Sequence, residues 1–185
     1  MRGQHLLKKE GPTEDKPLRF GAGAVLIEDF EMNRNKRYKL NYLSKEFYIK
    51  YNSIDYPEIE NKESRPYMVM LIKIDNNTFA VPFRTNVKHS NCYKFKTSTR
   101  PTDTVTGLDY TKAVIVNDDT YIGPSARIND KEYVELDRNF HLIAKAFTAY
   151  VKGYIKYASC KKVTYNAQKY KYTTLRYFHA ELGLE

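Results

Sequence analysis

The sequence predicts an α+β domain in which about three helices pack on a compact, strongly curved antiparallel sheet of five or six strands. Two apolar runs, residues 67–74 and 78–81, flank the turn-forming residues Asp75-Asn76-Asn77, and this pattern predicts an antiparallel hairpin. A long amphipathic helix is predicted further along the chain, at residues 137–157. Because strand–helix–strand alternation and a glycine-rich turn are both missing, the pattern argues against a doubly wound nucleotide-binding fold.

The first elements of the domain are predicted just before the hairpin. Tyr38, Leu40 and Tyr42 alternate with polar residues as in a short strand, and Ser44 can cap a helix directly after it. The hairpin comes next, and we expect the chain to leave the sheet at Pro82.

The second half of the chain is predicted to add edge strands and the main helix. Short strands are expected at residues 92–95, 108–116 and 131–136, with a surface loop at 96–107. Asp137 can cap the amphipathic helix, and a last helix near 173–182 is expected to close the core. The apolar face of the main helix consists of Phe140, Ile143, Phe147, Tyr150, Val151 and Tyr154.

Length and composition indicate one domain with a short leader. The chain has 185 residues and is 42% apolar. Residues 1–36 mix glycine, proline and charges of both signs, so we expect a poorly ordered leader before a single domain at 37–185. No apolar run approaches the roughly 18 residues of a membrane span. The well-separated Cys92 and Cys160 lack metal-ligand spacing, so we expect a cytoplasmic protein without a metal or other cofactor.

Positive charge is concentrated in two stretches without acidic residues. Residues 76–102 contain five Lys and Arg, residues 138–180 contain nine more, and neither stretch contains Asp or Glu. Because these 14 charges exceed the net charge of +9, the remainder is net acidic, and this segregation indicates a polyanionic partner. Seven tyrosines lie within or beside the second stretch, a pattern that suits unpaired RNA bases. The alternative for most of these tyrosines is a half-buried place on a helix.

The stretch after Pro82 carries the side chains that phosphate chemistry requires. Metal-dependent nucleases gather carboxylates, and none lies near this stretch in sequence, so a metal-free route is the simpler one. In that route the RNA 2′-hydroxyl attacks phosphorus while one group removes its proton and another protonates the leaving oxygen. Lys88 and His89 can supply acid and base, and Arg84 and Thr85 can hold the phosphate. A solvated basic turn remains the alternative for this stretch.

Three segments of the chain together resemble a known family. The segments KLNYLSKEFY, RPYMVMLIKIDNNTFAVPFRTNVKH and GLDYTKAVIV occur in this order. They resemble the toxins of type III toxin–antitoxin systems, the ToxN/AbiQ-like endoribonucleases, and most closely the TenpN branch. The resemblance implies a MazF/ToxN-like fold and metal-independent cleavage that leaves a 2′,3′-cyclic phosphate. It also implies inhibition by a repetitive antitoxin RNA that the toxin processes, closed protein–RNA assemblies and a role in phage defence.

The resemblance also implies roles for single residues. Lys88 matches the catalytic lysine of the family, displaced by one residue, and Arg84-Thr85 stands where ToxN has a hydroxyl pair. Arg65 corresponds to the basic residue before the hairpin and Tyr48 to an early-helix tyrosine. The remaining residues expected to contact RNA are Tyr42, Asn86, Lys94 and Lys96.

Two functions are therefore open. The first is an endoribonuclease toxin whose partners are substrate mRNA and antitoxin RNA. We expect it to form a protein–RNA hetero-oligomer and not to bind a membrane. The second is a non-enzymatic RNA-binding module that uses the same basic residues and tyrosines to bind RNA in a groove. A DNA-binding regulator ranks third because no helix-turn-helix is legible.

Overall fold

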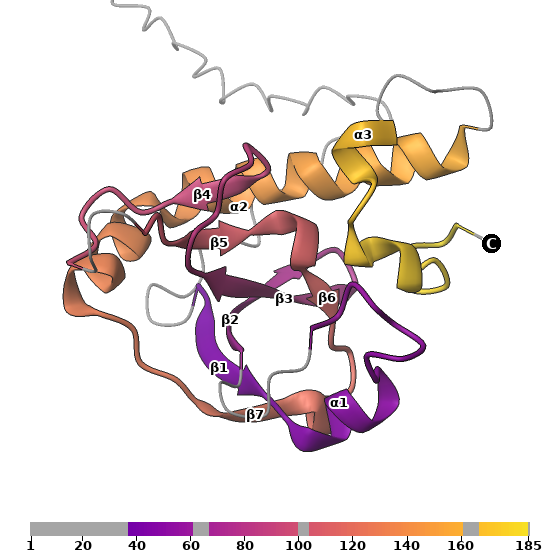
Figure 1. The fold of residues 1–185 in the computed structure, drawn as a ribbon, viewed down its shortest axis with the longest axis horizontal. Helices are drawn as coiled ribbons and strands as arrows, with labels where there is room; N and C mark the ends of the chain where they lie inside the picture. The colour runs from indigo at the N-terminus through magenta and orange to yellow at the C-terminus, as the bar shows by residue number, and fades with distance from the viewer. Residues whose placement is uncertain (1–36, 61–66, 100–103, 161–166, 185) are drawn as a thin grey trace, which may run out of the picture. The chain divides into compact units, whose positions relative to one another are not determined.

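A seven-stranded antiparallel sheet forms the centre of the structure (Figure 1). The computed structural model describes residues 37–60, 67–99, 104–160 and 167–184. Strand order is β4-β5-β3-β2-β1-β7, with β6 beside β3, so the sheet is open at β4 and β7. The described residues form an α+β fold as predicted, with one strand more than the upper estimate and with three α-helices. The predicted leader, residues 1–36, lies outside the described residues.

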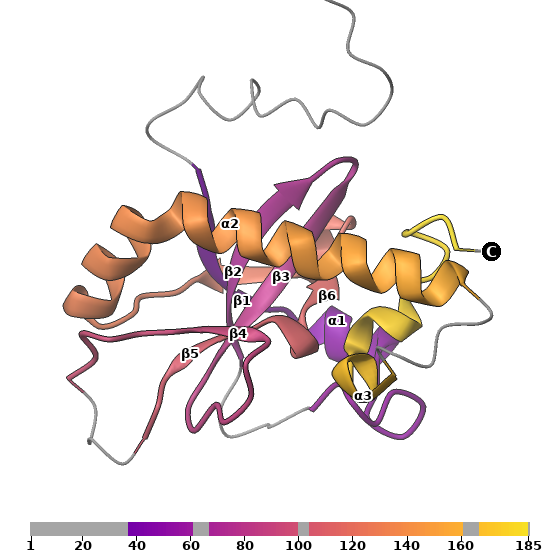
Figure 2. The same ribbon diagram turned by 90° about the horizontal axis from the view of Figure 1, so that it is seen from above.

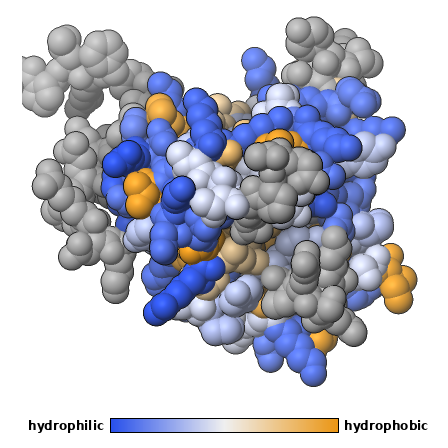
Figure 3. Space-filling model, turned by 60° about the vertical axis from the view of Figure 1, so that its left-hand side comes forward, coloured by the Kyte–Doolittle hydropathy of each residue, from blue (hydrophilic) through white to orange (hydrophobic). Residues whose placement is uncertain are grey.

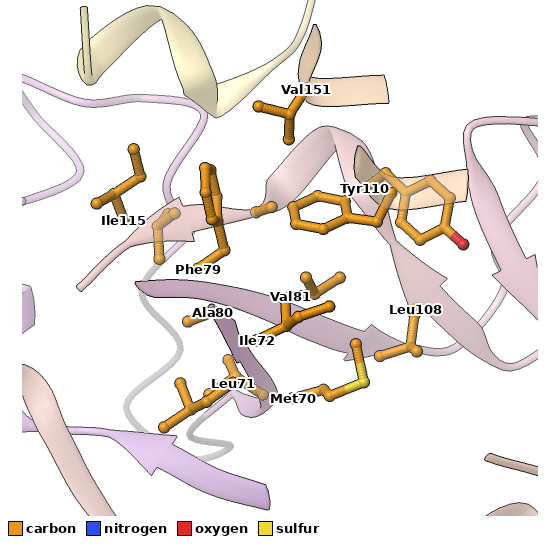
Figure 4. Packing of buried hydrophobic residues seen from close by; sticks show 14 of the residues in the cluster. Met70, Leu71, Ile72, Phe79, Ala80, Val81, Leu108, Tyr110, Ile115 and Val151 are labelled. Carbon is orange, nitrogen blue, oxygen red and sulfur yellow. The ribbon is translucent and has the colours of Figure 1, made fainter. Parts of the chain in front are cut away.

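The predicted hairpin is confirmed and forms the middle of the sheet. Strands β2 (Met68–Ile74) and β3 (Asn77–Arg84) pair from Ile74 opposite Asn77 to Val69 opposite Pro82. Asp75 turns the chain with a φ of 52°, a conformation that Asp tolerates better than most residues. Side chains from both strands pack into the core (Figure 4).

The expectation that the chain leaves the sheet at Pro82 is wrong. Pro82 lies inside β3, at the point where the second edge of this strand changes partner from β6 (Val114–Ile115) to β5 (Gly107–Asp109). A break between two partner strands tolerates a residue that cannot donate a ladder hydrogen bond. Arg84 is therefore the last residue of a strand, opposite Gly107, rather than part of a loop.

The expected single strand at 108–116 is also wrong, because the run divides into β5 and β6. A 3₁₀ turn at Tyr110–Lys112 separates the two, and the Asp109 carboxylate caps this turn by accepting from the Thr111 amide. The short strand β4 (Cys92–Lys94) is confirmed and pairs with β5, with Cys92 opposite Asp109.

The first strand and helix of the domain are confirmed. Strand β1 (Lys39–Leu43) pairs with β2 and is followed by α1 (Lys45–Lys50). The Ser44 hydroxyl accepts from the Phe47 amide at 3.2 Å and caps α1 as predicted. On its other side β1 pairs with β7 (Ile122–Ser125), a strand that was not predicted. The sequence Ile-Gly-Pro-Ser does not predict this edge strand, since Gly and Pro are typical of turns.

The long helix α2 (Asp130–Ser159) lies over the sheet (Figures 1 and 2). It begins seven residues before the predicted start, so the edge strand expected at 131–136 is wrong and Asn129, not Asp137, is the cap. The predicted apolar face of this helix is fully buried and confirmed. None of the helices in the described part of the chain has the length and hydrophobicity of a membrane span.

The C-terminal segment closes the core in a different form from the expected helix. It contains α3 (Ala167–Tyr170) and a 3₁₀ turn at Thr174–Tyr177 rather than a helix at 173–182. Leu175 and Phe178 are nevertheless fully buried, so the segment closes the core as expected. The Thr174 hydroxyl donates to the Ala113 carbonyl and fastens this segment to the sheet.

Candidate active site

The loop after β3 presents its polar side chains to solvent around one buried anchor. Thr85, Asn86, Lys88 and His89 are exposed, whereas Val87 is buried and its amide donates to the Val105 carbonyl at 3.0 Å. Asn86 has a φ of 60°, a left-handed conformation that Asn adopts readily. The anchored centre fixes the position of the loop while four functional groups remain accessible.

Asp109 on β5 joins the two ends of this loop. Its side chain is 2% exposed, and its Oδ1 lies 3.2 Å from His89 Nε2 while its Oδ2 accepts from the Arg84 guanidinium at 3.2 Å. Oδ1 also accepts from the amide and hydroxyl of Thr111, at 2.9 and 2.7 Å. The pairing of β3 with β5 therefore places a carboxylate between the predicted imidazole and guanidinium.

Arg84 makes a second ion pair, with Glu60. The guanidinium lies 3.0 Å from Glu60 Oε1, and Glu60 Oε2 accepts from the Tyr67 hydroxyl at 2.5 Å. Burial and the neighbouring Glu60 raise the pKa of Tyr67, so the phenol stays protonated as a donor. The predicted phosphate ligand Arg84 is thus held in place by two carboxylates that are distant in sequence.

A small cavity of about 30 Å³ lies behind this ion-pair network. Its lining includes six polar residues: Tyr48, Glu58, Glu60, Tyr67, Arg84 and Lys112. The Tyr48 hydroxyl is buried and has no hydrogen-bond partner among the described residues. Burial raises the pKa of Tyr48 to about 12, and the nearby backbone of Tyr67 counteracts this only in part. Tyr48 therefore lies under the site rather than on its surface.

Lys112 is the basic residue of this cavity that the sequence did not single out. Burial lowers the pKa of its ammonium, and the adjacent Arg84 lowers it further, while Glu60, Asp109 and Glu58 act in the opposite direction. Its Nζ donates to the Glu58 carbonyl at 3.1 Å. Lys112 is thus a half-buried amine whose charged form is disfavoured by burial and by Arg84.

Sequence reasoning missed the carboxylates of this site, Asp109 and Glu60. For Asp109 a signal existed, because it is the one acidic residue in the otherwise apolar and uncharged-polar run before Lys112. No comparable signal marks Glu60. The basic loop has no carboxylate close to it in sequence, as stated above. In the folded structure, however, Asp109 and Glu60 lie within ion-pair distance of His89 and Arg84.

The remaining predicted site residues lie in several places. Lys94 is exposed on β4 and Lys96 just beyond it, whereas Tyr42 is half-buried on β1 with β2 between it and β3. Arg65 lies outside the described residues. Thr85, Lys88 and His89 are therefore grouped with Arg84, and Tyr42 is separated from them.

Most of the C-terminal tyrosines pack against one another. Tyr150, Tyr154 and Tyr170 are buried, and the rings of Tyr150 and Tyr154 each contact that of Tyr170, with centroid distances of 5.3 and 5.4 Å. Tyr172, 58% exposed, is accessible, and Tyr165 lies outside the described residues. For the buried tyrosines the half-buried alternative was the better interpretation, because their rings are used in the core.

Comparisons with models of known protein families, with curated proteins and with solved structures found no match to this chain. Across residues 37–60, 67–99, 104–160 and 167–184, no three His, Cys, Asp or Glu side chains are grouped in a way that could hold a metal ion. The site must therefore be interpreted from its own geometry.

Proposed function

We propose that this chain is a metal-independent endoribonuclease, the toxin of a type III toxin–antitoxin system of the ToxN/AbiQ-like family. The observation that carries the proposal is the His89 imidazole, 3.2 Å from the buried Asp109 carboxylate, in an exposed loop with Lys88 and Thr85. A carboxylate that orients an imidazole is a recurrent arrangement for proton transfer. The MazF/ToxN-like fold rests on the sequence resemblance, and the antiparallel sheet with helices packed on it agrees with it only at the level of the α+β class.

The proposed reaction uses the ring nitrogen of His89 that does not face Asp109. Nε2 of His89 lies 3.2 Å from Asp109 Oδ1, so Nδ1 is the ring nitrogen assigned to the substrate, where an imidazole can transfer one proton. The RNA 2′-hydroxyl loses its proton as its oxygen bonds to phosphorus, and the bond from phosphorus to the 5′ oxygen then breaks. His89 and Lys88 are the two groups that remove the first proton and supply the second, leaving a 2′,3′-cyclic phosphate.

Positive charge for the transition state comes from the same loop and strand. Arg84 uses two of its nitrogens in ion pairs and retains further N–H groups for a phosphoryl oxygen. Lys88 forms no ion pair with another described residue, and the Thr85 hydroxyl is exposed beside Arg84 in sequence. These groups can stabilise the charge that develops on the non-bridging oxygens.

The experiment is cleavage of a labelled single-stranded RNA by purified protein in excess EDTA. We expect shorter products that end in a cyclic phosphate by mass spectrometry, and no cleavage at a position carrying a 2′-deoxyribose. Lys88→Ala and His89→Ala should each lower the rate by about 100-fold or more. His141→Ala and Lys145→Ala, which alter exposed residues of α2, are the matched controls and should cleave normally.

A non-enzymatic RNA-binding module is the second candidate. It is favoured by exposed cations such as Lys94 and Lys96, which suit phosphate contacts without requiring catalysis. A wild-type protein that shifts the RNA band and yields no product would establish this alternative. Normal cleavage by folded Lys88→Ala and His89→Ala variants would refute the assignment of the site. In either case the proposed partners are RNA, with the antitoxin RNA tested by co-expression and relief of toxicity.

A further inference from the structure

A second and larger hollow, of about 590 Å³, lies between the end of β4 and the first half of α2. Its volume falls in the range of sites that hold a small ligand or one unit of a polymer. The lining residues on which the argument depends are three cations and three residues with apolar or aromatic side chains: Lys96, Lys131, Arg138, Tyr93, Val134 and Leu142. We call it the α2 groove.

The α2 groove carries positive charge that is not neutralised. Lys96, Lys131 and Arg138 are exposed, and none of them forms an ion pair with another residue in the described part of the chain. Arg84 differs in this respect, since two carboxylates hold it. The free cations give the groove a preference for an anion.

The carboxylates of the groove do not cancel this preference. Glu135 accepts from the Thr97 hydroxyl at 2.6 Å, from the amides of Lys96 and Thr97, and from the Tyr93 hydroxyl. Burial alone would raise the pKa of Glu135, but these hydrogen bonds lower it, so the charge is already solvated by the protein. Asp130 lies in the first turn of α2, where the helix dipole favours a negative charge.

An apolar wall faces the same hollow. Val134 is 47% exposed and Leu142 52% exposed, although both line the groove. They stand four residues on either side of Arg138 and therefore share one face of the helix. Figure 3 brings forward the side on which α2 begins, and shows a few hydrophobic residues among mainly hydrophilic ones. Apolar side chains beside cations suit a base and its phosphate better than an ion alone.

The α2 groove adjoins the candidate active site through β4. Cys92 pairs with Asp109, its thiol donates to the His89 carbonyl at 3.0 Å, and the next residue, Tyr93, lines the groove. Lys94 is exposed on the same strand. An RNA strand bound at His89 would reach the α2 groove by crossing the edge strand β4, on which Lys94 is exposed.

We propose that the α2 groove binds the single-stranded RNA that flanks the cleaved bond, with Lys96, Lys131 and Arg138 on its phosphates and Val134 and Leu142 against a base. The inference rests on the proposed function for the position of the cleaved bond. It assigns to the first half of α2 the role of holding the strand outside the active site.

The test measures binding of a fluorescent 2′-O-methyl RNA 12-mer, which cannot be cleaved by attack of its own 2′-hydroxyl. Lys96→Ala, Lys131→Ala and Arg138→Ala should each weaken binding about five-fold at 0.1 M salt. Each should also reduce the slope of log affinity against log salt by about 0.7. Val134→Ser with Leu142→Ser should weaken binding at every salt concentration and leave the slope unchanged. Lys152→Ala, an exposed cation on α2 that does not line the groove, is the control.

Wild-type affinity and slope in the three cation variants, with normal unfolding curves, would overturn the inference. Competition by polyglutamate at the concentration that RNA requires would also overturn it, because the groove would then select an acidic polypeptide. Since the probe cannot be cleaved, loss of binding in the variants supports the groove even if wild-type protein fails to cleave ordinary RNA. Cleavage by wild type with unaltered binding in the variants would refute the groove and leave the proposed function standing.

Discussion

At the scale of single residues, two aspartates with the same local motif have different surroundings. Asp109 and Asp118 each accept from the amide and hydroxyl of a threonine two positions later, at 2.9 and 2.7 Å in both cases. Asp118 is exposed and makes no ion pair with another described residue. Asp109 is buried between Arg84 and His89. Comparing the two aspartates therefore separates the effect of capping a turn from the effect of neutralising the half-buried Arg84 guanidinium.

We predict that Asp109→Asn lowers the free energy of unfolding by about 2 kcal/mol and greatly reduces RNA cleavage. Asparagine keeps the shape and can still accept from Thr111, but it leaves Arg84 with only one carboxylate, and an uncompensated charge near the interior is destabilising. Urea unfolding at pH 7 measures the first effect. Asp118→Asn is the matched control and should change stability much less. An equal loss in both variants would mean that only the turn matters.

The sequence nominated the side chains of the candidate site but not the carboxylates around them. Arg84 and His89 both lie beside Asp109, and Thr85 and Lys88 are exposed in the same loop, while the roles predicted for these four residues stay predictions. The partners of Arg84 lie 24 and 25 positions away and reach it through sheet pairing, which no local pattern encodes. Counting basic residues along the sequence therefore overstated how many of them are free of an ion pair, since Arg84 pairs with two carboxylates.

At the scale of elements, the start of α2 shows why a local pattern can mislead. Glu132 and Glu135 are buried, and their carboxylates accept from side chains of the loop between β4 and β5. Glutamates on an expected solvent face made residues 131–136 resemble an edge strand. The partners that make their burial favourable, Thr97, Ser98 and Thr106, are more than 25 positions away. The sequence predicted the part of α2 whose apolar residues recur at helical spacing. It missed the first turns of α2, where the buried residues include Glu132 and Glu135.

We predict that Glu135 makes stability depend on pH in the acidic range. Its folded pKa lies below the ordinary value of 4.5, so the ionised form contributes stability that is present above this value and is lost as the pH falls through the folded pKa. Glu135→Gln should therefore be less stable than wild type at pH 7, and the difference should shrink below about pH 4. Urea unfolding at pH 7, 5 and 3.5 measures this, with Glu46→Gln on exposed α1 as control. A difference that stays constant with pH would contradict the role of the charge.

At the scale of the whole molecule, the sequence predicted the layers of the fold better than its connections. The hairpin, α1 with its cap and the buried face of α2 follow from periodicity and turn chemistry, and all are present. The division of residues 107–115 into two strands and the pairing of β7 with β1 depend on which edges are free in the assembled sheet. A strand of four residues with Gly and Pro is stabilised by its partner rather than by its own composition.

We predict that removing residues 1–34 leaves both stability and RNA binding unchanged. These residues contain six Lys and Arg and six Asp and Glu, so the rest of the chain carries the whole net charge of +9. The hydrophobic core of the described residues also begins only at Tyr38. The truncated and full-length proteins should therefore share one urea midpoint and one salt dependence for the 2′-O-methyl RNA, since salt dependence reports phosphate contacts by cations. A shallower salt dependence after truncation would show that the first 34 residues contribute cations to the RNA interface, and a lower midpoint would show that they stabilise the domain.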